Sequence, residues 1–199
     1  MYKLRAAICC ILLALGGFSG PLHAFESSNW QLTAYAARYS PERMIDILRA
    51  GPRFDERRAY ISALAMGYEV GRTGDYLHWE LEGQLVQHHR YQDHHEFNAL
   101  VIARWTRFPW DHRVRTSIAF GEGLSYASAV PPIEPRGDRD GGESARLLNY
   151  LLVELELGLP HSPQWGLVAR LHHRSGVFGL YNGVNGGSNY IGGGLRYRF

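Results

Sequence analysis

The sequence predicts an all-β fold, an eight-stranded antiparallel up-and-down β-barrel that spans a membrane, between Trp30 and the C-terminal Phe199. Three observations predict this fold. Segments of about ten residues alternate between apolar and polar side chains, which is the period of strands whose two faces meet different environments. Long and short connections alternate between these segments. The last segment also alternates and ends on an aromatic residue.

The N-terminal residues have the order of a secretory signal peptide. Two basic residues precede an apolar run from Ile8 to Leu15, and small residues follow up to Ala24. The apolar run has about half of the ~20 residues that a membrane-spanning helix needs. We therefore expect residues 1–24 to be cleaved on export and residues 25–199 to form one barrel domain.

The composition restricts the class of function. The chain has 21 basic and 19 acidic residues, and a net charge of +2 gives no electrostatic case for nucleic acid. Both cysteines, Cys9 and Cys10, lie in the expected signal peptide. The mature chain therefore has no disulfide and no thiol for chemistry, and we expect no cofactor.

The first three strands are predicted as follows. Trp30 to Tyr39 and Arg58 to Val70 are separated by a charged loop with two prolines, Pro41 to Arg57. The turn Gly71 to Gly74 leads to the third strand, Asp75 to Gln87. This strand alternates cleanly, and its apolar face carries Leu77, Trp79, Leu81 and Leu85.

Two more strands follow a polar loop, His88 to His95. Glu96 to Thr106 is the fourth strand, and Arg107 to Asp111 is the next short turn. His112 to Leu124 is the fifth strand. The long loop after it, Ser125 to Glu143, is rich in proline, glycine and charge, which is typical of an exposed connection.

The remaining strands complete the set. Ser144 to Leu157 is rich in leucine and a helix is the alternative, but its leucines alternate with polar residues and favour a strand. After the turn Leu159 to Pro163, the chain returns along Gln164 to Ser175. Gly187 to Phe199 is the last strand, and one of its faces carries Ile191, Leu195, Tyr197 and Phe199.

The alternation of connection lengths favours a bacterial outer-membrane barrel, whose extracellular loops are long and whose periplasmic turns are short. The aromatic end resembles the C-terminal signal of bacterial outer-membrane proteins, so we expect the barrel-assembly machinery as a partner during insertion. The tryptophans fall at the periplasmic end, where an aromatic girdle is expected. They are Trp30, Trp79, Trp105, Trp110 and Trp165. The rival is a soluble lipocalin-like barrel, whose apolar face would point inward.

The interior of such a barrel is predicted to be charged. Eight strands enclose a space just wide enough for side chains, so we expect paired charges there and no pore. The residues expected to form these pairs are Glu80, Glu82, Glu154, Glu156, Arg104, Arg115, Arg170 and Arg196.

Two polar residues continue the lipid-facing parity of the seventh strand. Its apolar face starts at Trp165 and continues through Leu171 to His173 and Ser175. Polar side chains that face lipid are candidates for function, and two residues along a strand share a face. A serine becomes a nucleophile beside a base such as histidine. The alternative is a rim position, where polar side chains meet lipid headgroups.

The same segment resembles a known family. His173 to Gly176, followed by Asn182-Gly183 and Asn185 to Gly187, is similar to the His-x-Ser and asparagine-glycine pattern of the lipid A 3-O-deacylase family. Members of that family are eight-stranded outer-membrane barrels. The resemblance implies an esterase that works among outer-membrane lipids and hydrolyses an ester-linked acyl chain of lipid A, the lipid part of lipopolysaccharide.

The resemblance also implies roles for single residues. Ser175 corresponds to the nucleophile and His173 to the general base, and Asn182 or Asn185 helps to hold the oxyanion. The family's glutamate, which follows the serine, has no counterpart because the chain has no acidic residue after Glu156.

Glu122 on the fifth strand is a candidate substitute for this acid, because alternation directs it toward lipid. Strands lie ~4.8 Å apart, so Glu122 and His173, two strands apart, are roughly 10 Å apart unless barrel tilt or a bridge through Asn149 joins them. The alternative is a register shift by one residue, which turns Glu122 inward to pair with an arginine.

Four histidines surround one extracellular loop, namely His88, His89, His94 and His95. Imidazoles bind zinc or copper, but this spacing matches no established site, and adjacent strand residues point to opposite faces. We interpret the segment as a solvated polar loop and expect no metal.

Two other functions remain open. One is a non-enzymatic barrel with a structural role or a surface-interaction role through the loops Pro41 to Arg57 and Ser125 to Glu143. The other, less favoured, is acyl transfer between phospholipid and lipid A, which needs an acyl pocket inside the barrel. An inward-facing Ser175 excludes the esterase, whereas an outward-facing Ser175 beside His173 keeps it.

Overall fold

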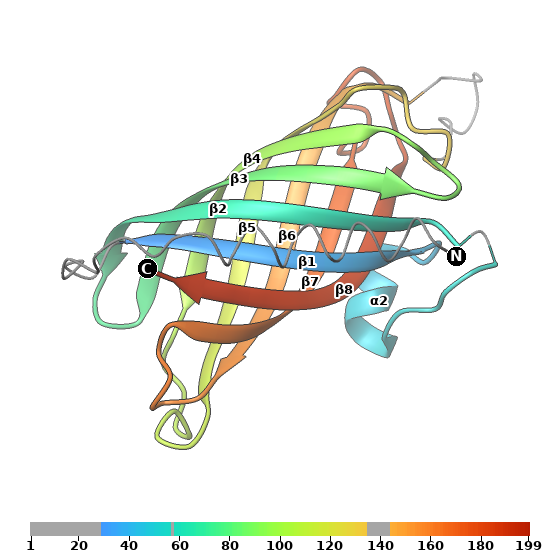
Figure 1. Cartoon of the computed structure of the whole chain (residues 1–199). Coiled ribbons are helices and arrows are strands. Elements are labelled where there is room, and N and C mark those ends of the chain that lie inside the picture. Colours follow the sequence, from blue (N-terminus) through green and yellow to red (C-terminus); the bar gives the residue numbers. More distant parts are fainter. Residues whose placement is uncertain (1–28, 57, 135–143) are drawn as a thin grey trace, which may run out of the picture.

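The computed structural model describes residues 29–56, 58–134 and 144–199. Eight strands in them form one closed antiparallel barrel, in which β8 pairs with β1 (Figure 1). The predicted fold class is therefore confirmed. The expected signal peptide, residues 1–24, lies outside the described residues. No helix in the described part of the chain is long and apolar enough to cross a bilayer.

The strand ends lie within three residues of their predicted positions. The strands are β1 (Trp30–Ser40), β2 (Tyr60–Thr73), β3 (Leu77–His89), β4 (His95–Trp105), β5 (Arg115–Ala127), β6 (Leu147–Gly158), β7 (Trp165–Ser175) and β8 (Gly187–Arg198). The leucine-rich segment is the strand β6, as its alternation predicts. A short helix, α2 (Met44–Ala50), stands in the first loop, which was expected to be irregular. It lies near the end of the barrel opposite the C-terminus (Figure 1).

The predicted alternation of connection lengths is wrong at one hairpin. Residues 90–94 join β3 to β4 at the extracellular end, and they are fewer than residues 106–114, which join β4 to β5 at the periplasmic end. The physical reason is that the β3–β4 pairing extends into the expected loop. The backbone N–H of His88 donates to the carbonyl of His94 at 3.0 Å. The remaining extracellular connections are long, as predicted.

The outer wall of the barrel is apolar. Side chains such as Leu81, Phe97 and Phe120 are about half exposed, although each belongs to a strand whose alternate residues are buried. The predicted tryptophan girdle is confirmed, because all five tryptophans are exposed at the end that carries the C-terminus. An apolar band flanked by aromatic side chains is the surface that a transmembrane β-barrel presents to lipid.

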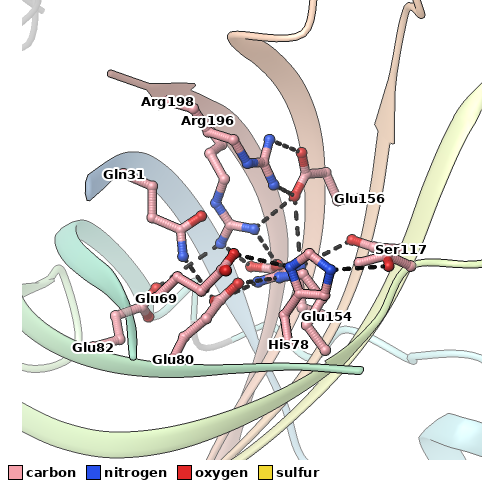
Figure 2. Close-up of polar contacts among 12 residues, drawn as sticks. Gln31, Glu69, His78, Glu80, Glu82, Ser117, Glu154, Glu156, Arg196 and Arg198 are labelled. Carbon is pink, nitrogen blue, oxygen red and sulfur yellow. Dashed lines mark hydrogen bonds and ion pairs between the residues drawn. The ribbon is translucent and has the colours of Figure 1, made fainter. Parts of the chain in front are cut away.

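The interior is crossed by ion pairs, as predicted. Glu154 accepts contacts from the guanidinium groups of Arg104 and Arg196, each at 2.7 Å, and from that of Arg170. Arg196 also reaches Glu156 at 2.7 Å (Figure 2). Charges removed from water are costly unless they are paired, and these side chains satisfy one another across the lumen.

Two arginines differ from the expectation. Arg115 forms no ion pair with any described residue, and its guanidinium donates to the carbonyl of Trp165 at 3.1 Å. β5 begins at Arg115, so this side chain lies at the mouth of the barrel rather than within it. Arg198 joins the network instead and contacts Glu156 at 2.5 Å (Figure 2).

Candidate functional site

A groove opens on the outer wall near the extracellular end of β5 to β8. Its volume is about 580 Å³. The strands supply Glu122, Asn149, Leu151, His173, Ser175 and Asn189, and the loops supply Pro41, Glu42, Arg43, Met44, Val177, Phe178, Asn185 and Gly186. Five of the six site residues singled out from the sequence line this groove, and the exception is Asn182.

Antiparallel pairing explains why these side chains meet. Ser175 lies opposite Asn149 of β6, and His173 lies opposite Asn189 of β8. Paired residues point to the same face of a sheet. Ser175 and His173 therefore share the outer wall, as their parity predicts.

Asn189 orients His173. The Nδ1 atom of His173 lies 2.6 Å from the Oδ1 atom of Asn189, and the Nδ2 atom of Asn189 donates to the carbonyl of Glu42 at 2.8 Å. The second bond fixes which end of the amide faces the imidazole. Because Oδ1 only accepts, Nδ1 carries the proton and Nε2 has a free lone pair. His173 is thus held in the tautomer of a general base.

Asn189 was not singled out from the sequence. Its parity, which it shares with Ile191 on the lipid-facing side of β8, was the available signal. The conventional partner of a catalytic histidine is a carboxylate, and Asn189 offers an amide oxygen instead. The pairing of His173 with Asn189 depends on the register between β7 and β8, which alternation alone does not give.

Glu122 faces outward, so the alternative of an inward register shift is wrong. Its carboxylate accepts a hydrogen bond from Nδ2 of Asn149, which also donates to the carbonyl of Gly123 at 3.2 Å. Leu151 pairs with Glu122 on one side and with His173 on the other. Within the described chain neither Glu122 nor Asn149 forms a hydrogen bond with His173, whose imidazole pairs with Asn189 instead.

The Ser175 hydroxyl makes no hydrogen bond with any other described group. Its Cα lies about 6.6–7 Å from that of His173, the spacing of two residues along one strand. In ligand-free enzymes the hydrogen bond between nucleophile and base is often long and tightens only when substrate binds.

The two asparagines expected to hold an oxyanion differ. Nδ2 of Asn182 donates to the carbonyl of Leu147 at 3.1 Å, and the residue does not line the groove. Asn185 does line it, and its side-chain amide is exposed and bonded to nothing in the described chain. Of the two, Asn185 therefore has a free donor at the site.

The backbone turns sharply directly after Ser175. Val177 and Phe178 have φ angles of 48° and 54°, a conformation that is costly for a β-branched or bulky residue. A Cβ atom on Gly176 would lie 1.9 Å from the carbonyl oxygen of Val184, so only glycine fits there. The turn leaves the Phe178 ring almost wholly exposed at the edge of the groove.

The four histidines at the β3–β4 hairpin form two groups that face opposite sides of the wall. His89 and His95 are exposed, whereas His88 and His94 are buried inside the barrel. The prediction of a solvated loop is therefore wrong for His88 and His94. The alternation of inward-facing and outward-facing side chains continues to the tip of the hairpin, and both residues face inward. Nε2 of His88 contacts a carboxylate oxygen of Glu96 at 2.9 Å. Burial lowers the pKa of His94 to about 4.

No sequence-family model matches the chain, and no curated protein matches it. Among solved structures it is similar to the outer membrane enzyme PagL, with a TM-score of 0.59 and 11% identity over 85% of this chain and 99% of that one. It is also similar to Neisserial surface protein A, with a TM-score of 0.52 and 18% identity over 88% of this chain and 100% of the other. At these identities the likeness shows the fold, which an enzyme and a surface protein share. The chain is an eight-stranded β-barrel of the outer-membrane type.

Proposed function

We propose that this chain is an outer-membrane esterase that hydrolyses an ester-linked acyl chain of lipid A in lipopolysaccharide. The observation that carries the proposal is the hydrogen bond between His173 and Asn189, which leaves Nε2 of His173 as a base. The pair lies in a groove of the lipid-facing wall, and His173 is two residues from Ser175 along β7. Lipid esters reach such a groove directly from the membrane.

The proposed chemistry is acyl transfer in two steps. Oγ of Ser175 attacks the ester carbonyl carbon while Nε2 of His173 takes the hydroxyl proton. The side-chain amide of Asn185 donates to the oxyanion that forms. The intermediate collapses, the sugar oxygen leaves with the proton from His173, and water then hydrolyses the acyl-serine by the same route.

The lining of the groove supports an amphiphile with acyl chains as substrate. Met44, Leu151 and Val177 supply apolar surface for an acyl chain. Arg43 lines the same groove and offers a guanidinium group, which binds phosphate well. Lipid A combines acyl chains with phosphates, and the resemblance of the His173 to Gly187 segment to lipid A 3-O-deacylases supports the same substrate.

An amide as the orienting group is consistent with hydrolysis. Papain-like proteases use asparagine in this position beside their catalytic histidine. The fold is also compatible, because a similar barrel belongs to the outer membrane enzyme PagL. The proposed triad is therefore Ser175, His173 and Asn189, with no carboxylate.

The test is the mass of lipid A from cells that make the parent chain or Ser175→Ala at equal outer-membrane abundance. We expect the parent alone to remove the mass of one acyl chain. Ser62→Ala is the matched control, because Ser62 is also an exposed serine of the outer wall and its hydroxyl contacts His89 at 2.8 Å. Unchanged lipid A with the parent, or loss of activity in Ser62→Ala, contradicts the proposal.

A non-enzymatic surface role is the second candidate. It is favoured by the absence of a hydrogen bond between Ser175 and His173 among the described residues. In this case the exposed apolar side chains of the last loop, Phe178 and Leu180, serve as a contact surface. Lipid A of the same mass in the parent and in Ser175→Ala is the result that this candidate predicts.

A further inference from the structure

A cluster of side chains that can bind a metal ion lies inside the barrel at the β3–β4 hairpin. One ligand atom each of His88, His94 and Glu96 lies within 4.8 Å of the others, and all three residues are buried. Ligands of a tetrahedral zinc ion at about 2.0–2.2 Å are roughly 3.4 Å apart. Side-chain rotations that move the ligand atoms by roughly an ångström therefore allow all three atoms to bind one ion.

The hairpin itself places these residues together. The backbone hydrogen bond from His88 to His94 makes them cross-strand neighbours next to the pair Gln87 and His95. His94 and Glu96 are two residues apart and share the inner face. All three ligands thus stand on one short hairpin, and a site on a rigid element is held in place more precisely than a site on a loop.

One ligand atom has no other partner. Nε2 of His94 is buried and forms no hydrogen bond within the described chain. A buried polar atom normally has a partner, and a metal ion supplies one. The imidazole of His94 stacks face to face on that of His88 with ring centroids 4.0 Å apart, which keeps the two rings close together.

A neighbouring side chain holds Glu96 in position. Nε2 of His172 lies 3.0 Å from one oxygen of Glu96, and the other oxygen lies 2.9 Å from Nε2 of His88. Supporting contacts of this kind orient the ligands in metal sites.

We propose that His88, His94 and Glu96 bind one Zn²⁺ ion inside the extracellular end of the barrel. Two imidazoles and a carboxylate are a ligand set that zinc accepts, with water in the fourth position. The ion joins the two strands of the β3–β4 hairpin to each other near its tip. The site lies on the inner face of the wall, and its role is independent of the proposed esterase.

The test is a titration of the full chain, folded in detergent micelles and freed of metal, with Zn²⁺ followed by calorimetry. We expect one ion per chain, and we expect His88→Gln and His94→Gln each to weaken binding at least about tenfold. His89→Gln and His95→Gln are the matched controls, since these neighbouring imidazoles point outward. No stoichiometric binding, or binding lost only in the controls, overturns the proposal.

X-ray absorption at the zinc edge of the loaded parent chain needs no variant and therefore no assumption about folding. The expected spectrum shows two imidazole ligands together with oxygen. A zinc shell without imidazole overturns the proposal, even if one ion binds.

Discussion

The amide of Asn189 contacts both the proposed base and the loop that covers the groove. It accepts from His173 and donates to Glu42. A neutral amide fixes the tautomer of the imidazole but adds no negative charge to stabilise the imidazolium that forms during reaction. This residue therefore acts by positioning His173.

Substitution of Asn189 separates positioning from folding. Asn189→Ala removes the acceptor for Nδ1, and we expect kcat of ester hydrolysis in micelles to fall about 10²-fold, within the range of general-base catalysis. Asn189→Asp keeps an acceptor and should restore most of the rate. Asn182→Ala is the control, because its amide bonds Leu147. Equal rates in all three variants exclude a role for Asn189 in the reaction.

Parity predicts which single residues face lipid but not which of them meet. His173, Ser175 and Glu122 were placed on the outer wall from alternation alone, because the period of a strand fixes its faces. The partner of His173 was missed, because it depends on how β7 and β8 align. The register adds this information, and it also separates Glu122 from His173 by Leu151.

The strand β8 carries glycines where it approaches β1. A Cβ atom on Gly192 would lie 1.9 Å from the carbonyl oxygen of Ala36, and one on Gly194 would lie 2.0 Å from that of Ala34. Neighbouring backbone therefore occupies the space of a side chain at both positions. Glycine is required there for the last strand to close the barrel.

An alanine in β8 should therefore destabilise the barrel. We expect Gly192→Ala to lower the free energy of unfolding by about 1–3 kcal/mol or more, since overpacking against backbone is not easily relieved. Gly83→Ala is the control, because a Cβ atom there meets nothing within 4 Å. Urea unfolding in micelles measures both variants, and equal midpoints contradict the closure argument.

The helix α2 was not predicted, whereas every strand was. Strand periodicity persists over ten or more residues here, but α2 has only seven, too few for a helical period to stand out. The helix nevertheless contributes Met44 to the groove.

A substitution in α2 tests whether this helix contacts the acyl chain. Met44→Ala removes apolar surface from the groove, and we expect kcat/KM to fall roughly fivefold, which corresponds to about 1 kcal/mol of lost apolar contact. Leu48→Ala is the control, because Leu48 is exposed on the same helix and does not line the groove. An equal loss in both variants indicates a general effect of the loop.

Across the whole molecule, the inner ion pairs connect distant strands. Glu154 on β6 contacts arginines of β4, β7 and β8. That these residues lie inside was predicted from alternation. Their pairings were not predicted, because each depends on the stagger of several strands.

Removal of Glu154 should weaken the whole barrel. Glu154→Gln leaves three buried guanidinium groups without their shared carboxylate, and we expect a loss of about 3–5 kcal/mol in the free energy of unfolding. Glu122→Gln changes an exposed carboxylate of the outer wall and should cost about 1 kcal/mol or less. Urea unfolding measures both variants. If their midpoints coincide, the network does not have the proposed structural role.

The pairing of Asn189 has a consequence for when the protein becomes active. Asn189 lies between His173 on the seventh strand and Ser40 on the first, and Glu42 lies two residues after the end of the first strand. The bond to Glu42 that fixes the orientation of the Asn189 amide thus forms only when the two ends of the chain meet. A polypeptide still in transit through the periplasm has no assembled triad, so the proposed hydrolysis starts on arrival in the membrane and spares lipids encountered on the way.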